Sequence, residues 1–266
     1  MVNERTILLV GRTGKGRSTL ANVMSNTNNF KESEYGISQS EGAQIGHFRL
    51  KGEDMIYHII DAIGIGDNRF TEAETLSRLT NAINGVSNGL NQIFFVFSGR
   101  FTKEDVKAYN LLRTVLFAED ISKYTTIVQT NFPSFRDPEQ RRKNKEVMMS
   151  QNEDVATILR SCNRLIHVNN LTEKEDRQLR TRNDCRAFLR KYLSTNCKEF
   201  YQPSNLNEIN ERIRNYLDEK SHGDEQQSQI NQLLKENRQL QERINNLVAQ
   251  QVQQQHFNPF GFPRNF

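Results

Sequence analysis

A glycine-rich segment near the N-terminus has the residue types and spacing of a phosphate-binding loop. The apolar run Ile7–Val10 ends at Gly11, four residues separate Gly11 from Gly16, and a basic residue and a serine follow. Glycines allow backbone conformations and close approaches that a side chain would block. The N–H groups of the loop and of the next helix turn can then point at phosphate oxygens. The pattern predicts a strand–loop–helix phosphate site, and the alternative is a glycine-rich turn without a ligand.

The loop departs from the usual pattern G-x-x-x-x-G-K-[ST] at one position. Arg17 stands where that pattern has lysine. The basic residue neutralises the β- and γ-phosphates, and Ser18 offers its hydroxyl to Mg²⁺. A guanidinium keeps the charge but is planar and bulkier than an ammonium, so activity does not follow from the match alone. The expected nucleotide-binding residues of this segment are Gly11, Arg12, Thr13, Gly14, Lys15, Gly16, Arg17, Ser18 and Thr19.

A second motif, Asp61-Ala-Ile-Gly64, closes the apolar stretch that begins at Met55. At a strand end after such a loop, the carboxylate holds Mg²⁺ through water and the Gly64 N–H meets the γ-phosphate. An ordinary strand-ending turn is the alternative. In the polar segment between the two motifs, Ser40 is expected as a further metal ligand, with Ser38 as its neighbour of the same kind. The predicted metal ligands are therefore Ser18, Ser40 and Asp61.

Two residues bear on catalysis. Ile65 follows Gly64 at the position where many GTPases have a water-orienting glutamine, so we expect very slow hydrolysis by a monomer. Arg100 follows the apolar run Gln92–Phe97 and is the expected catalytic cation. Its alternative is a surface arginine beside a helix cap formed by Thr102.

Composition narrows the class of protein. The 266 residues suffice for one nucleotide-binding domain and an appendage. A mean hydropathy of −0.74 indicates an added polar segment. A net charge of +4 with mixed signs does not argue for a nucleic-acid partner. Three cysteines without a C-x-x-C pair fit reduced thiols. No apolar run reaches membrane-helix length, so we expect a cytoplasmic protein without a transmembrane segment.

Alternating strand and helix patterns after an opening hairpin predict an α/β domain over residues 1–200. We expect a mixed, mostly parallel sheet with helices on both faces. The predicted strands are Thr6–Val10, Gln44–Leu50, Met55–Asp61, Gln92–Phe97, Tyr124–Thr130 and Leu165–Asn169. The predicted helices are Ser18–Asn26, Thr71–Val86, Thr102–Phe117, Asp137–Ser161 and Lys174–Leu193.

Residues 201–252 are expected to form a helical extension. From Gln227 onward its apolar positions recur in alternating steps of three and four, with isoleucine in one register and leucine in the other. Asn237 lies in the isoleucine register, which favours a parallel two-stranded coiled coil. The alternative is one amphipathic helix folded onto the domain. Residues 253–266, with four phenylalanines among Gly and Pro, are predicted to be disordered, as a short linear motif or a weak membrane-surface contact.

Together these motifs resemble the immunity-associated, AIG-type GTPases, which are related to septins and to chloroplast protein-import receptor GTPases. The resemblance covers about residues 4–195 and rests most on Gly99-Arg-Phe-Thr102 and on the terminal pair in Arg164–Asn170. It implies binding of GTP and GDP and a homodimer through the G domains. It also implies that Arg100 reaches across the dimer and that Asn169 and Asn170 pack against the base.

The chain departs from that family in the loop that reads the base. Within Gln129–Ser134, Ser134 stands where an aspartate normally accepts from guanine, and Asp137 comes three residues later. Asn131 of this loop is a further expected nucleotide-binding residue. Ala62 in place of threonine is a milder departure. Guanine preference thus rests on the resemblance and on Asn169 and Asn170, and adenine stays open.

The expected function is a guanine-nucleotide-binding P-loop protein. We expect a slow, dimerisation-dependent GTPase that acts as a switch or assembly module. The alternative is a non-hydrolysing scaffold that uses the coiled coil. A P-loop ATPase or kinase is a third interpretation, but the chain lacks the arginine cluster of a kinase lid.

Overall fold

The structure is a computed structural model. It describes residues 3–32, 42–50, 54–84, 89–117, 119–162, 164–178, 180–220 and 231–246. Its strands are β1 (Asn3–Gly11), β2 (Gln44–Arg49), β3 (Met55–Asp61), β4 (Gln92–Ser98), β5 (Thr125–Thr130) and β6 (Arg164–His167). Its helices are α1 (Arg17–Ser25), α2 (Glu72–Asn84), α3 (Lys103–Leu111), α4 (Pro138–Gln151), α5 (Glu153–Ser161), α6 (Arg180–Asn196) and α7 (Leu206–Lys220). A π-helical turn, Leu112–Leu116, and a 3-10 segment, Glu119–Tyr124, connect α3 to β5.

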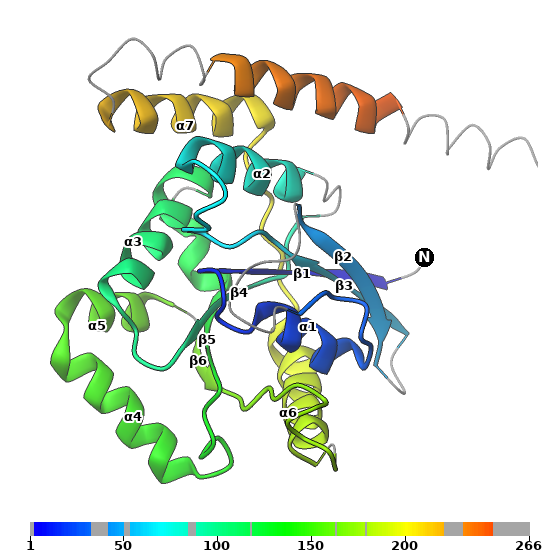
Figure 1. The fold of residues 1–266 in the computed structure, drawn as a ribbon, viewed down its shortest axis with the longest axis vertical. Coiled ribbons are helices and arrows are strands. Elements are labelled where there is room, and N and C mark those ends of the chain that lie inside the picture. Colours follow the sequence, from blue (N-terminus) through cyan, green and yellow to red (C-terminus); the bar gives the residue numbers. More distant parts are fainter. Residues whose placement is uncertain are drawn as a thin grey trace, which may run out of the picture.

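The predicted mixed, mostly parallel sheet is confirmed. Its strands lie in the order β2-β3-β1-β4-β5-β6 (Figure 1). β2 pairs antiparallel with β3 as the expected hairpin, and every other pairing is parallel. The carboxyl ends of the parallel strands therefore meet at one edge of the sheet, where ligands of such folds bind.

Side chains of the central strand alternate between two apolar clusters, as a strand buried on both faces requires. Ile7 and Leu9 join the cluster that includes α1 and α6. Leu8 and Val10 join the cluster that includes α2, α3, α5 and α7. The expectation of helices on both faces is thereby confirmed (Figure 1).

One predicted helix is in fact two. The expected helix Asp137–Ser161 is interrupted at Asn152, which adopts an extended conformation with φ −153° and ψ 120°. The Asn152 side chain accepts hydrogen bonds from the N–H groups of Asp154 and Val155, at 2.8 and 3.2 Å. Asn152 is therefore the N-cap of α5, because its side chain accepts from N–H groups that have no partner within the helix. Its extended backbone separates α5 from α4.

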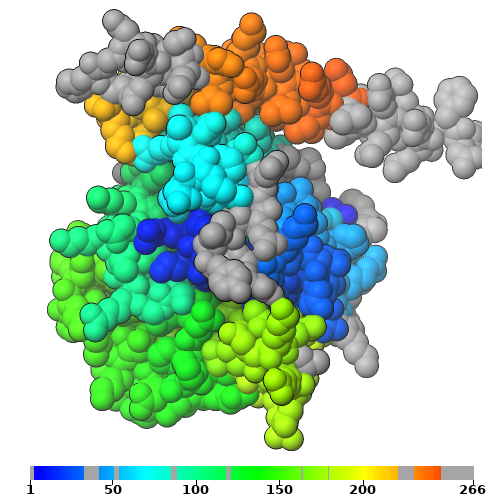
Figure 2. Space-filling view, in the orientation of Figure 1, coloured from blue at the N-terminus to red at the C-terminus, as the bar shows by residue number. Residues whose placement is uncertain are grey.

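A C-terminal helix, residues 231–246, lies beside α7 and against α2 (Figures 1 and 2). Asn237 is buried in this contact, and its Oδ1 accepts from Ser77 Oγ at 2.6 Å and from Asn81 Nδ2 at 2.9 Å. Leu234 packs against the domain core. The coiled coil is thus not confirmed. Asn237 instead lies as in the alternative, in which the amphipathic helix folds onto the domain. The phenylalanine-rich segment 253–266 lies outside the described residues.

No helix among the described residues combines the length and the apolar character that a membrane crossing needs.

Candidate nucleotide-binding site

The loop between β1 and α1 has the backbone geometry of a phosphate cradle. Gly11, Gly14 and Gly16 have φ values of +143°, +75° and +81°. These are left-handed conformations that favour glycine. At Gly11 a Cβ atom would also lie 2.2 Å from the carbonyl oxygen of Val96 in β4. The strand–loop–helix prediction is therefore supported by the close approach of two backbones as well as by the motif.

Two side chains from the neighbouring strand ends hold the loop carbonyls. Thr130 Oγ1 donates to the carbonyl of Lys15 at 2.7 Å, and Asn170 Nδ2 donates to the carbonyl of Gly16 at 2.8 Å. In a trans peptide the C=O and the next N–H point in opposite directions. The N–H groups of Gly16 and Arg17 consequently point away from β5 and β6, at the N-terminus of α1. These N–H groups have no hydrogen-bond partner within the described part of the chain, and N–H groups of this kind are what an anion site at a helix N-terminus offers.

The Asp61–Gly64 segment lies directly against this loop. The Ile65 N–H donates to the carbonyl of Gly11 at 3.0 Å, and the Thr13 N–H donates to the carbonyl of Ile65 at 3.4 Å. Gly64 is so close that a Cβ atom there would lie 2.7 Å from both N and Cα of Thr13. The two motifs predicted from the sequence thus form one contiguous structure.

Arg17 points into this junction. It is 7% exposed, and its Nη1 donates to the carbonyl of Ala62 at 2.5 Å. Its Nε lies 3.9 Å from Asp61 Oδ1, and Asp61 is 3% exposed. Burial lowers the pKa of Arg17, while Asp61 and Asp67 oppose that change. Burial raises the pKa of Asp61, which Arg17 and Ser18 counteract. The arginine side chain therefore pairs with the carboxylate end of β3.

The predicted metal ligands are not arranged for a divalent ion. Ser18 Oγ donates its proton to Asp61 Oδ2 at 2.6 Å, and the Asp61 Oδ1 faces the Arg17 guanidinium. Ser40 lies outside the described residues. Within the described ranges, no group of three or more His, Cys, Asp and Glu side chains could hold a metal. The Arg17 guanidinium faces Asp61 Oδ1, an oxygen that makes no hydrogen bond within the described part of the chain. Because this buried cation opposes a second positive charge at the same carboxylate, these residues do not fit Mg²⁺ as they lie here.

The expected base-reading residues gather at the far end of the loop. Asn131, with φ +53°, donates its N–H to Asn170 Oδ1 at 3.3 Å. Asn170 is buried, so its amide holds the loop and the start of the β5 turn together. Asn169 lies beside it, half-buried, and donates its N–H to Cys185 Sγ at 3.2 Å. Ser134 is exposed.

Asp137, three residues after the position at which the base-reading aspartate is expected, lies at the start of α4. Its carboxylate accepts from the N–H groups of Glu139 and Gln140, at 2.9 and 3.2 Å, as the N-cap of α4. The carboxylate therefore has its partners within its own helix turn.

Arg100 is exposed and lies just past the carboxyl end of β4. It makes no hydrogen bond or ion pair within the part of the chain that the structure describes. Two contacts fix its segment. Gln129 Nε2 donates to the carbonyl of Gly99 at 2.8 Å, and Thr102 and Asp105 form a capping box at the start of α3. Arg100 is thus presented outward on a held backbone, at the edge that carries the phosphate cradle.

Two features were missed by sequence reasoning. Thr130 was expected only as a strand residue, yet it holds the loop; a threonine at a strand end carries no pattern that would reveal this.

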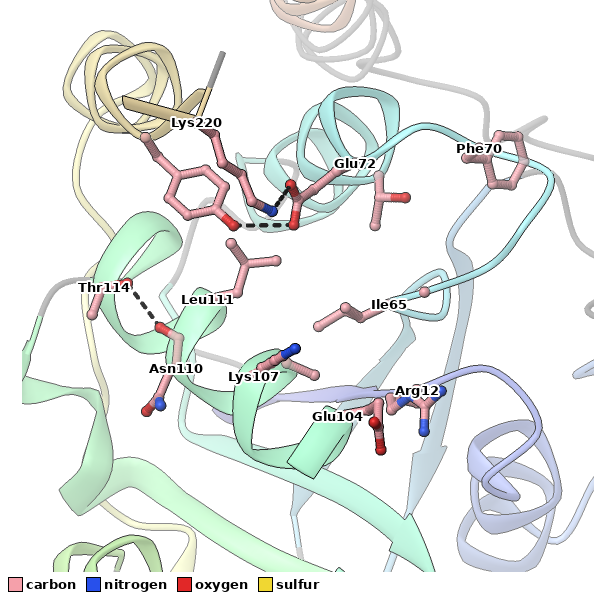
Figure 3. Close-up of a pocket in the computed structure, with 14 residues that line it drawn as sticks. Arg12, Ile65, Phe70, Glu72, Glu104, Lys107, Asn110, Leu111, Thr114 and Lys220 are labelled. Carbon is pink, nitrogen blue, oxygen red and sulfur yellow. Dashed lines mark hydrogen bonds and ion pairs between the residues drawn. The ribbon is translucent and has the colours of Figure 1, made fainter. Parts of the chain in front are cut away.

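A cavity of about 580 Å³ opens beside the cradle, between α2, α3 and α7 (Figure 3). Arg12 and Ile65 reach it from the cradle side, and Glu72 joins Tyr216 and Lys220 of α7 across its opposite wall. The cavity could not be predicted because α7 lies about 100 residues after α2 and α3 in the sequence.

The fold and the loop together define a P-loop GTPase fold. Era from Aquifex aeolicus bound to GDP and aluminium fluoride has a TM-score of 0.51 at 11% identity, covering 76% of this chain and 62% of that chain. Toc33 from Arabidopsis thaliana in complex with Mg²⁺ and GMPPNP has a TM-score of 0.51 at 16% identity, covering 76% and 89%. At these identities the similarity establishes the fold alone.

The family follows from the sequence match. The model of the AIG1 family matches residues 5–212, so this chain belongs to the AIG1 family. Two curated relatives from Arabidopsis thaliana are immune-associated nucleotide-binding proteins 10 and 9, at 27% identity over 141 residues and 26% over 176. The matches cover 51% and 64% of this chain, but only 29% and 49% of those relatives. The chain therefore spans at most about half the length of these relatives.

Proposed function

We propose that this chain binds a guanine nucleotide at the loop Gly11–Thr19 and acts as a nucleotide-dependent switch or assembly module. The observation that carries the proposal is the cradle itself. Three glycines have positive φ, and two loop carbonyls are held by Thr130 and Asn170, so that loop N–H groups remain for phosphate oxygens. The AIG1 family and the guanine nucleotides bound by Era and Toc33 support guanine as the base.

Direct titration tests this proposal. Labelled GDP, GTP, ADP and ATP are titrated into the full chain, into Gly16→Ala and into Gly42→Ala. A Cβ at Gly16 is strained by a φ of +81° and lies 3.0 Å from Asn170 Nδ2, whereas a Cβ at Gly42 meets nothing within 4 Å. We expect guanine nucleotides to bind the wild type and Gly42→Ala, and Gly16→Ala to bind at least about tenfold more weakly. No binding at millimolar nucleotide refutes the proposal, and equal binding of ATP refutes the guanine part.

The proposal includes slow hydrolysis in a pair of G domains. Ile65 supplies no group that could orient water, and its backbone is bonded to Gly11. Arg100, exposed at the nucleotide edge, would stabilise charge on the γ-phosphate of the partner. Hydrolysis per molecule should rise with protein concentration, and Arg100→Ala should abolish that rise and leave binding intact. Lys103→Ala, also exposed, is the matched control.

The second candidate is a non-hydrolysing scaffold. The apolar, buried side chain of Ile65 favours it, and a hydrolysis rate of zero at every concentration would select it. Binding of Mg²⁺ at Ser18, Ser40 and Asp61 stays a prediction. The position of the Arg17 side chain beside Asp61 argues against it. The proposal also includes a domain division at about residues 200 and 252 and a homodimer. It further includes the lack of a nucleic-acid partner and a cytoplasmic location.

A further inference from the structure

The Arg17 guanidinium faces one oxygen of the carboxylate that is expected to hold a divalent ion. Arg17 follows Gly16, at the position of the lysine that normally reaches toward the phosphates, yet its side chain turns to the end of β3. There it contacts the carbonyl of Ala62 and faces Asp61, the residue expected to hold the metal. The neighbouring hydroxyl of Ser18 is bonded to the same carboxylate.

The burial of Asp61 raises the question of which cation compensates its negative charge. A carboxylate that is 3% exposed requires a compensating cation, because burying an unpaired charge is costly. In an ordinary P-loop site, Mg²⁺ held by the loop serine and this aspartate supplies it. Here a guanidinium 3.9 Å away supplies it from within the chain. A second cation at the same carboxylate would be repelled by the first, and displacing the guanidinium would leave it buried without a partner.

We propose that the guanidinium of Arg17 takes the place of the metal ion, so that this chain holds the phosphates of its nucleotide without requiring Mg²⁺. The inference rests on the proposed nucleotide binding. It names the ligand as free nucleoside phosphate and not its magnesium complex. Phosphate charge is then met by loop N–H groups, the N-terminus of α1 and the nearby guanidinium. Since no metal bridges the β- and γ-phosphates, GDP and GTP should bind with similar affinity.

The test compares nucleotide affinity in excess Mg²⁺ and in EDTA. For the wild type the dissociation constant for labelled GDP should change by less than about threefold between the two media. Arg17→Lys carries a compact ammonium that can turn to the phosphates and free Asp61, so its affinity should fall about tenfold or more in EDTA. Arg214→Lys, the same substitution at an exposed position of α7 away from the loop, should behave as the wild type.

The outcomes separate the two claims. A wild-type affinity that falls tenfold or more in EDTA overturns the inference and leaves the proposed function standing. Absence of binding in both media overturns the proposed function, and the inference with it. Equal affinity in both media for wild type and Arg17→Lys alike also overturns it, because Arg17 would then have no part in metal independence.

A readout without nucleotide tests the placement of the guanidinium. The melting temperatures of Arg17→Met, Asp61→Asn and the double variant are compared with that of the wild type. If the two groups compensate each other, the double variant should lose less than the sum of the two single losses. Additive losses would show that they do not interact, which contradicts the inference.

Discussion

Replacing Gly64 by alanine should separate the two motifs of the proposed nucleotide site. The new Cβ would lie 2.0 Å from Thr13 Oγ1, which can rotate, but 2.7 Å from Thr13 N and Cα, which cannot. The backbones must therefore move apart. Two hydrogen bonds are lost in that movement, from Ile65 N–H to Gly11 and from Thr13 N–H to Ile65. At about 0.5–1.5 kcal/mol each, the loss of stability should be about 1–3 kcal/mol.

Urea unfolding of the full chain, followed by circular dichroism, measures this loss. Gly42→Ala is the matched control, since a Cβ at Gly42 meets nothing within 4 Å. The control should stay within about 0.5 kcal/mol of the wild type. If Gly64→Ala is as stable as the control, the loop and the Asp61–Gly64 segment are not in contact in solution, and the reasoning about the junction fails.

Three further predictions concern the C-terminal helix, a buried histidine and the loop glycine. Asn237→Ala removes the oxygen that accepts from Ser77 and Asn81, and should lower the unfolding free energy by about 1–3 kcal/mol; unchanged stability with lost self-association in light scattering would instead support the coiled coil. Burial lowers the pKa of His167 from 6.5 to about 4, so the unfolded chain binds the proton more readily. The free energy of unfolding should fall by about 2 kcal/mol when the pH is lowered from 7 to 5, and urea unfolding of His167→Gln should lack this part of the pH dependence. An equal pH dependence of the unfolding free energy in both proteins would refute the assignment. Gly11→Ala places a Cβ 2.2 Å from the Val96 carbonyl and should yield little folded protein by circular dichroism, and a normally folded variant would contradict the close packing of β1 on β4.

The sequence was most informative where the backbone itself imposes a residue type. Gly11 and Gly16 stand at positions of positive φ, and at Gly11 a neighbouring strand leaves no room for a side chain. Local constraints of this kind leave a readable pattern, as does the antiparallel β2–β3 pair. The break at Asn152 was missed because the flanking segments both have helical composition and only the side-chain cap separates them.

The orientation of side chains could not be predicted, because it depends on partners far along the chain. Arg17 was expected to face phosphate, but its partners Asp61 and Ala62 come from β3. Asn237 has the spacing of a coiled-coil position, and the same spacing suits a helix that packs on α2. One amphipathic pattern is compatible with either surface, and the partners on the domain, among them Ser77 and Asn81, are not visible in that pattern.

A competition experiment tests the central claim that this loop holds a guanine nucleotide. The purified full chain is incubated with an equimolar mixture of GDP and ADP, freed of unbound nucleotide and heat-denatured, and the released nucleotide is identified by chromatography. We predict GDP in an amount close to that of the protein, and much less GDP from Gly16→Ala treated in the same way. Release of ADP in its place, or of neither nucleotide from the wild type, would contradict the account.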